Sequence, residues 1–269
     1  MGLRFDPNLN SLGAQRQLNQ ATNRQVRGLQ ALASGLRINR AADDASGLAI
    51  AEALRSQVIQ DNAEVGNLQS AINAAGTADA AIGTQQDAVG RIQELATQAA
   101  NGTLTDDQRA AINEEAQQLL DQINDTASNT EFNGQQLIDG SNPQVNVGTE
   151  SGNQLNLPAS TTASLGLDGL DLSTQGGAQA ALDQVQNAQD QIANNRASLG
   201  AQSNAFGSAI EERQNSALNN QAAESQIRDL DIARQSIEQS RNSLRQQLSI
   251  FALVNNRIAP EAAAQLLGR

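Results

Sequence analysis

The chain lacks the side chains on which most enzymatic chemistry depends. Its 269 residues contain no histidine, cysteine, tyrosine or tryptophan, and because all 17 basic residues are arginine, lysine is absent too. General acid–base and nucleophilic catalysis mostly use groups that titrate near neutral pH, and zinc sites mostly use cysteine and histidine. The composition therefore predicts a protein that is not an enzyme and that binds no metal and no cofactor.

The scarcity of aromatic residues also argues against a compact core. Aromatic residues make up 1% of the chain, whereas 39% of it is hydrophobic and much of that is alanine. Alanine buries little apolar area per residue, so we expect thin helices that pack closely over a long interface.

Charge and hydropathy exclude two classes of partner. The net charge of −12 disfavours nucleic acid, since phosphate binding needs basic clusters. No apolar run reaches the length of a transmembrane helix, so membrane insertion is not expected. Residues 1–7 have no apolar signal core, and if the protein is secreted, we expect export without a cleaved signal peptide.

Local signals predict helical arms on either side of a short β-rich centre. A first helix is expected from Pro7 to about Leu36, and Asp43 or Asp44 then caps a second helix that extends to about Ala100. A helix cap is a better interpretation of these two aspartates than a metal site. The apolar seam of the second helix follows steps of three and four: Ala51, Leu54, Val58, Val65, Leu68, Ile72, Ala75, Ile82 and Val89.

Polar and small residues interrupt this second helix. Asp61, Asp79 and Gln86 lie on its apolar seam, where polar residues weaken packing but define register. Four glycines lie within the helix and indicate either local weakness or close approach of another helix: Gly66, Gly76, Gly83 and Gly90.

The pattern changes after a third helix. Thr105 and Gln108 form a capping box, and the inner face of this helix consists of Ile112, Ala116, Leu119, Ile123 and Ala127. Turn signals then predict a β region over about residues 133–174. Helix returns near Gly177 with a second seam: Leu182, Val185, Ile192, Leu199, Phe206 and Ile210. The expected fold is mainly α, with long antiparallel coiled-coil arms and a small central β-hairpin region.

Two apolar stripes near the termini have no apolar partner in their own neighbourhood. One recurs every seven residues: Leu230, Ile237, Leu244, Phe251 and Ile258. The other contains Leu18, Leu29, Leu32 and Leu36. Each stripe is typical of a helix edge that packs against another helix. Such stripes predict an assembly protein, and the alternative is an ordinary intramolecular coiled coil.

At this point the chain resembles the bacterial flagellins. Residues 32–51, LASGLRINRAADDASGLAIA, resemble the N-terminal signature of that family. Shorter motifs of the family lie before and after this signature, in the family's order: residues 11–16, 94–96, 101–103, 132–134, 164–167, 198–201 and 227–236. Two features depart from the family: the tail from Leu248 onward is unusually apolar, and the centre is too short for a variable outer domain.

The resemblance implies a structural subunit that polymerises into the extracellular flagellar filament, with a hook–filament junction protein as the alternative. Residues 1–42 with 232–269 would form an inner terminal coiled-coil domain, helical and paired in the polymer, that lines the filament tube. Residues 43–231 would form a middle helical-arm domain without an outer domain. The implied partners are other copies of the chain, an export chaperone, the export apparatus, and the filament cap and junction proteins.

The resemblance further implies a contact with a Toll-like innate receptor. In flagellins that engage this receptor, the contact lies on the middle helices, and the matching residues are Arg91, Leu95 and Glu115. Arg91 and Leu95 are four residues apart and so share a helix face.

Overall fold

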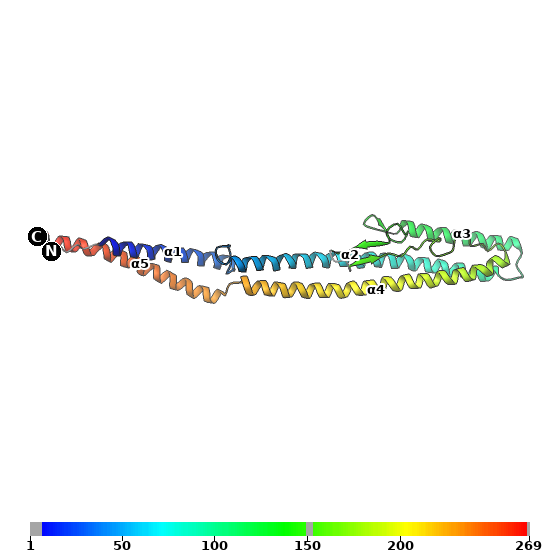
Figure 1. Cartoon of the computed structure of the whole chain (residues 1–269). Coiled ribbons are helices and arrows are strands. Elements are labelled where there is room, and N and C mark those ends of the chain that lie inside the picture. Colours follow the sequence, from blue (N-terminus) through cyan, green and yellow to red (C-terminus); the bar gives the residue numbers. More distant parts are fainter. Residues whose placement is uncertain (1–6, 149–152, 268–269) are drawn as a thin grey trace. The chain divides into compact units, whose positions relative to one another are not determined.

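The computed structural model describes residues 7–148 and 153–267, with side chains over 12–148 and 153–254. The predicted mainly α fold is confirmed. The elements follow in the order α1 (Pro7–Ser34), α2 (Ala45–Ala99), α3 (Asp106–Asn129), β1 (Glu131–Phe132), β2 (Gln135–Gln136), β3 (Gln144–Asn146), β4 (Gln154–Asn156), α4 (Gln175–Arg228) and α5 (Ile232–Leu267) (Figure 1).

The chain forms two compact units. The terminal unit comprises residues 1–58 and 218–269, and the central unit comprises residues 59–217, so α2 and α4 each contribute to both. The domains that we expected from the sequence, residues 1–42 with 232–269 and residues 43–231, have their boundaries near the ends of helices, whereas the boundaries of the two compact units lie within α2 and α4. The inner and middle domains of a polymer therefore stay a prediction.

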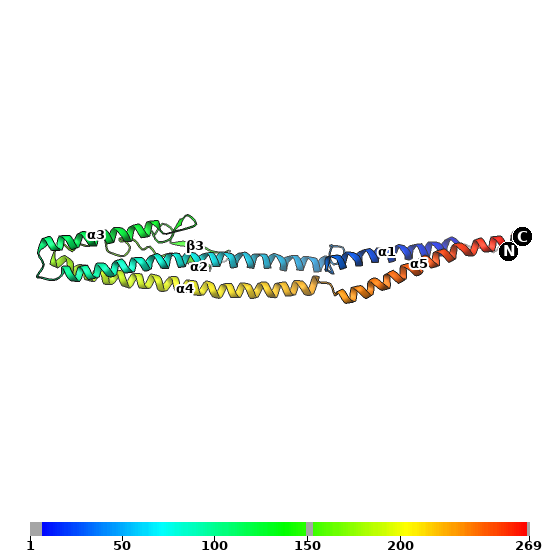
Figure 2. The ribbon, with the colours of Figure 1, turned by 180° about the vertical axis from the view of Figure 1, so that it is seen from behind.

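Antiparallel helices α1 and α5 form most of the terminal unit (Figures 1 and 2). Helix α1 ends at Gly35, whose φ of 71° is the left-handed conformation that glycine adopts easily. Leu36 then pairs with Asp229 in an isolated β-bridge. The backbone N–H of Leu230 donates to the carbonyl of Gly35 at 3.0 Å. The link between α1 and α2 is thus tied to the link between α4 and α5.

Asp44 caps helix α2, as the sequence predicted. Its Oδ1 accepts a hydrogen bond from the backbone N–H of Gly47 at 2.8 Å, and this bond, with that from the Ser46 hydroxyl, lowers the pKa of Asp44. Asp43 instead accepts from the backbone N–H groups of Asn39 and Arg40. Both carboxylates therefore satisfy the backbone around the start of the helix.

The central unit packs α2, α3 and α4 around one core. The seam predicted for α4 and the part of the α2 seam from Leu68 onward lie in or against this core, whereas Ala51, Leu54, Val58 and Val65 do not belong to it. The buried seam residues include Leu68, Ile82, Val89, Val185, Ile192, Leu199 and Phe206. On α3 the predicted inner residue Leu119 is only half-buried, while its neighbour Leu120 is buried, so both leucines contact the core. The capping box of Thr105 and Gln108 is confirmed.

Polar residues on the α2 seam pair with arginines of α4. Arg196 contacts Asp79 at 2.8 Å and Gln86 at 2.8 Å, and its pKa is raised by the hydrogen bond to Asp79. Arg213 pairs in the same way with Asp61 and with neighbouring Glu64. These pairs fix the register between two helices whose alanine-rich seams specify it weakly.

The four glycines within α2 do not mark a close helix approach inside this chain. A Cβ atom added at Gly66, Gly76, Gly83 or Gly90 would meet no described atom within 4 Å beyond the neighbouring residues and nearby backbone of its own helix. Close approach by another helix of the same chain is therefore the wrong interpretation. Each glycine weakens the helix by about 1 kcal/mol relative to alanine.

Two short hairpins follow α3. Strands β1 and β2 are joined by Asn133 and Gly134, both with positive φ, as a tight type I′ hairpin requires. Strands β3 and β4 pair Val145 with Leu155. The strands end at Asn156, and the rest of the predicted region of strands and loops contains turns at Gly166 and Gly169, both with positive φ. Leucines of that segment complete the core: Leu165, Leu167, Leu170 and Leu172.

Candidate assembly surface

The apolar stripe of α5 faces away from α1. Ile237, Leu244 and Phe251 are 57–69% exposed, and neighbouring Leu248 is exposed as well. Leu230 is half-buried, and the side chain of Ile258 lies outside the described residues. The stripe therefore has no complete partner among the described residues of its own chain.

The apolar residues of α1 are covered only in part. Leu29 is exposed, as is Val26 one turn away. Leu18, Leu32 and Leu36 are half-buried. Exposed apolar residues on both helices make the surface of the α1–α5 pair unusually apolar for a protein whose mean hydropathy is −0.45.

A different, polar stripe of α5 packs against α1. Its members are spaced four and three residues apart and are buried or half-buried: Gln235, Gln239, Asn242, Gln246 and Ser249. The Gln246 amide donates to the Thr22 hydroxyl at 3.2 Å. Small residues of α1, Ala21 and Gly28, allow the close approach, and a Cβ atom added at Gly28 would lie 2.5 Å from Gln239 Oε1.

This polar seam makes the intramolecular pair weak. Among the described residues, the buried oxygens Gln239 Oε1 and Asn242 Oδ1 accept no hydrogen bond. Each such oxygen costs about 1–3 kcal/mol, and polar residues at seam positions lower the stability of paired helices. The α1–α5 pair thus holds itself together with its polar side and presents its apolar side outward.

The three residues predicted to contact an innate receptor do not form one surface. Arg91 donates to Glu115 at 2.8 and 3.0 Å and pairs with Glu94 at 2.8 Å. The hydrogen bonds that Arg91 donates to Glu94 and Glu115 raise the pKa of Arg91. Leu95, however, is only 1% exposed. It packs into the core of the central unit and is no aliphatic anchor on that surface, so only the arginine and the glutamate stay as predicted contact residues.

The described part of the chain shows no feature of a metal centre or of a membrane span. Over those residues, no three histidine, cysteine, aspartate or glutamate side chains are grouped as metal ligands would be. The helices described are also too polar for any of them to cross a bilayer.

Comparison with known proteins identifies the family. The family model for the bacterial flagellin N-terminal helical region matches residues 5–143, and the model for the C-terminal helical region matches residues 182–267. The chain belongs to the bacterial flagellin family. This flagellin is 34% identical to a flagellin of Halalkalibacterium halodurans over 97% of this chain and 98% of that relative.

Other relatives cover nearly the same length. A flagellin of Bacillus subtilis is 32% identical over 98% of this chain and 100% of its own. A flagellar filament 30.7 kDa core protein of Treponema maltophilum is 33% identical over 91% and 93%. Such relatives favour a structural subunit of the filament over the junction-protein alternative, and this flagellin is such a subunit.

One solved structure shows a similar fold. A flagellar hook-associated protein of Vibrio parahaemolyticus matches 70% of this chain and 100% of its own with a TM-score of 0.58, and at 12% identity it supports the fold alone. The crystal structure of Bacillus cereus flagellin is 30% identical, covers 55% of this chain and 88% of its own, and gives a TM-score of 0.49.

Sequence reasoning found the apolar stripe of α5 and missed its polar one. The amides at 235, 239, 242 and 246 have the same three-and-four spacing as an apolar seam. That spacing is a usable signal, because glutamine and asparagine recurring on one helix face also mark a surface that meets another helix.

Proposed function

We propose that this flagellin polymerises through the apolar stripe that its α1–α5 pair leaves exposed, and that the resulting filament is extracellular. The stripe consists of the residues already predicted from the sequence, with Ile237, Leu244 and Phe251 at its centre. The observation that carries the proposal is the packing of α5, whose polar side meets α1 while the apolar side chains of Ile237, Leu244 and Phe251 stay 57–69% exposed among the described residues.

The energetics favour association of several copies. Burial of a large apolar side chain contributes about 1.5–3 kcal/mol, whereas ordering the backbone of a residue costs about 1–2 kcal/mol. The polar seam alone offsets little of that cost. Apolar burial against neighbouring copies supplies the missing stabilisation, so the terminal helices gain most of their stability in the polymer.

An exposed apolar stripe also defines the partners of the unassembled chain. A subunit that carries such a stripe must be kept from premature association. An export chaperone that covers α5 is therefore a proposed partner. The export apparatus, the filament cap and the junction proteins are proposed partners that meet the chain before or during assembly.

Removal of α5 tests this proposal. A chain that lacks residues 232–269 is expected to stay monomeric under conditions in which the full chain forms filaments. The central unit has its own core, so the truncated chain should keep the helical circular dichroism of α2, α3 and α4. Electron microscopy and sedimentation measure the outcome, and normal filaments from the truncated chain would refute the proposal.

A further inference from the structure

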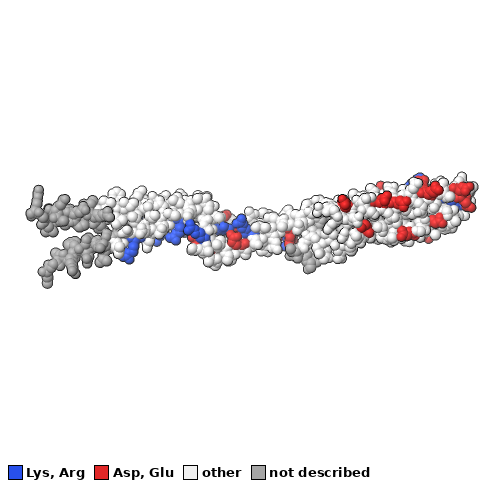
Figure 3. Space-filling model, turned by 90° about the horizontal axis from the view of Figure 1, so that it is seen from above, with Lys and Arg blue, Asp and Glu red and all other residues white. Residues whose placement is uncertain are grey.

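The two units of this flagellin carry opposite charge. The terminal unit contains 13 arginines and nine acidic residues, which gives it a formal charge of +4. The central unit contains four arginines and 20 acidic residues, which gives −16. Figure 3 shows arginines gathered on the terminal unit and carboxylates on the central unit. The net charge of −12 hides this separation.

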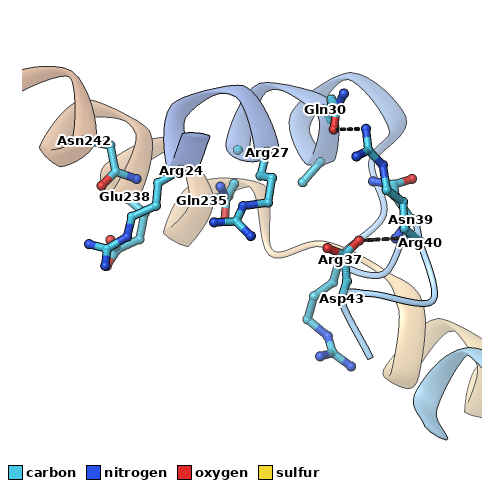
Figure 4. A pocket seen from close by; sticks show the side chains of 12 residues that line it. Arg24, Arg27, Gln30, Arg37, Asn39, Arg40, Asp43, Gln235, Glu238 and Asn242 are labelled. Atoms are coloured by element: carbon cyan, nitrogen blue, oxygen red, sulfur yellow. Dashed lines mark hydrogen bonds between the residues drawn. The ribbon is translucent and has the colours of Figure 1, made fainter. Parts of the chain in front are cut away.

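Four arginines of the terminal unit line one pocket. Arg24 and Arg27 come from α1, and Arg37 and Arg40 come from the link that follows it (Figure 4). The pocket has a volume of about 380 Å³, and Gln235, Glu238 and Asn242 of α5 form its other wall. All of these residues belong to the terminal unit.

The pocket keeps its positive charge because its four arginines form no ion pair with any carboxylate in the described part of the chain. Arg37 donates to the carbonyl of Ile227, and Arg40 donates to the side-chain oxygen of Gln30 at 2.7 Å. Within the described residues, the guanidinium groups of Arg24 and Arg27 make no hydrogen bond and no ion pair.

The two carboxylates of the pocket are already engaged. Asp43 accepts hydrogen bonds from the backbone N–H groups of Asn39 and Arg40, and Glu238 pairs with Arg241 at 3.3 Å. The pocket is thus an exposed site with at least two free guanidinium groups, which suit carboxylates that can accept two parallel hydrogen bonds.

The central unit offers a matching surface. Asp107, Glu114, Asp121 and Asp125 are all exposed and fall on one face of α3, because they are spaced seven, seven and four residues apart. The ion pairs formed within the described chain include none of these four. The one arginine of this helix, Arg109, is buried and donates to the carbonyls of Ala99 and Asn101.

We propose that the arginine pocket of one subunit binds carboxylates of the central unit of a second copy, with the acidic row of α3 as the surface that offers them. The inference rests on the proposed function, since it concerns contacts in the polymer. Apolar burial is non-directional and does not by itself select one register between neighbouring copies. Complementary charges provide that selection and speed productive encounter.

The absence of lysine from this chain allows a sharp test. The substitution Arg27→Lys introduces the only side-chain amine, and a carbodiimide then joins that amine to any carboxylate in direct contact. Filaments are assembled from a mixture of 14N- and 15N-labelled variant, treated with carbodiimide, digested and analysed by mass spectrometry. Mixed-isotope peptides identify links between copies.

The expected product joins the introduced lysine to a residue of the acidic row in another copy. Arg91→Lys serves as the positive control, because Glu94 and Glu115 of the same copy lie beside residue 91. Links only to Asp43 or Glu238 of the same copy would overturn the inference, as would no link at residue 27 when the control reacts. In either case normal filaments would leave the proposed function standing, whereas failure of the unaltered chain to polymerise would refute that function itself.

A charge reversal gives a second readout. Arg27→Glu is expected to slow filament growth about tenfold or more at low salt, with a smaller effect when salt screens the contact. Arg55→Glu is the matched control, because Arg55 is an exposed arginine of the same unit outside the pocket. Equal growth rates for the two variants at every salt concentration would also overturn the inference.

Discussion

The exposed stripe of α5 can be tested by removing its apolar character without disturbing the subunit. Leu244 and Phe251 are 58% and 69% exposed in the single chain, so the double substitution Leu244→Gln/Phe251→Gln should leave the monomer's stability nearly unchanged. Glutamine is also a good helix former. In the polymer, both side chains are expected to be buried against neighbouring copies, where the substitution removes favourable burial.

The size of the effect follows from the exposed area. Full burial of such a side chain contributes about 1.5–3 kcal/mol. Because each is already partly covered by its own helix, roughly 1–2 kcal/mol per side chain is left to gain on assembly. The pair contributes about 2–4 kcal/mol, which corresponds to a rise of about 30- to 1,000-fold in the critical concentration for polymerisation.

Sedimentation of filaments from monomer over a concentration series measures that critical concentration. The matched control is Leu218→Gln, because Leu218 is 63% exposed on α4, outside the α1–α5 pair. The control should assemble at nearly the concentration of the unaltered chain. A critical concentration within threefold of the control for the double variant would refute the assignment of this stripe to assembly. Loss of helical circular dichroism in the monomer would show instead that the stripe stabilises the single chain.

Four further outcomes follow from the structure. Gln239→Leu/Asn242→Leu should raise the monomer's Tm, since it replaces two unpaired amide oxygens with apolar contacts; a lowered Tm would contradict the weak seam. Gln85 is buried and forms hydrogen bonds with two backbone carbonyls and a hydroxyl. Gln85→Leu should therefore lower the free energy of unfolding, measured with denaturant, by about 2–4 kcal/mol. A loss below about 1 kcal/mol would show that these bonds do not stabilise the central unit. The hydrogen bonds that Asp44 accepts at the start of α2 lower its pKa, so the stabilisation by Asp44 is complete above the ordinary value of 3.8 and is lost as pH falls through the lowered pKa. Asp44→Ala should therefore reduce Tm at pH 7, and this difference from the unaltered chain should disappear in strong acid. Arg91→Ala should reduce signalling by monomers in innate-receptor reporter cells, and unchanged signalling would exclude this arginine from the contact.

Local and periodic features of the fold were predictable from the sequence. The capping box at Thr105, the cap at Asp44 and the turn at Asn133-Gly134 each depend on a few neighbouring residues. The seams of α2 and α4 were predictable because one helix face repeats every three to four residues. The region of strands and loops between α3 and α4 was predictable from its turn signals, whereas the burial of the leucines in its last loop depends on the surface that they meet.

The sequence by itself determined that α5 carries an apolar stripe, but only the tertiary structure decided which side of α5 meets α1. The apolar and the amide stripes have the same spacing, and the choice depends on Ala21 and Gly28 of the facing helix, which admit the amides closely. The burial of Leu95 depends likewise on elements far apart in the chain, and so does the arginine pocket, whose other wall comes from α5. A periodic pattern determines the face of a helix on which a residue lies, whereas the surface that covers this face is determined by the packing of the other elements.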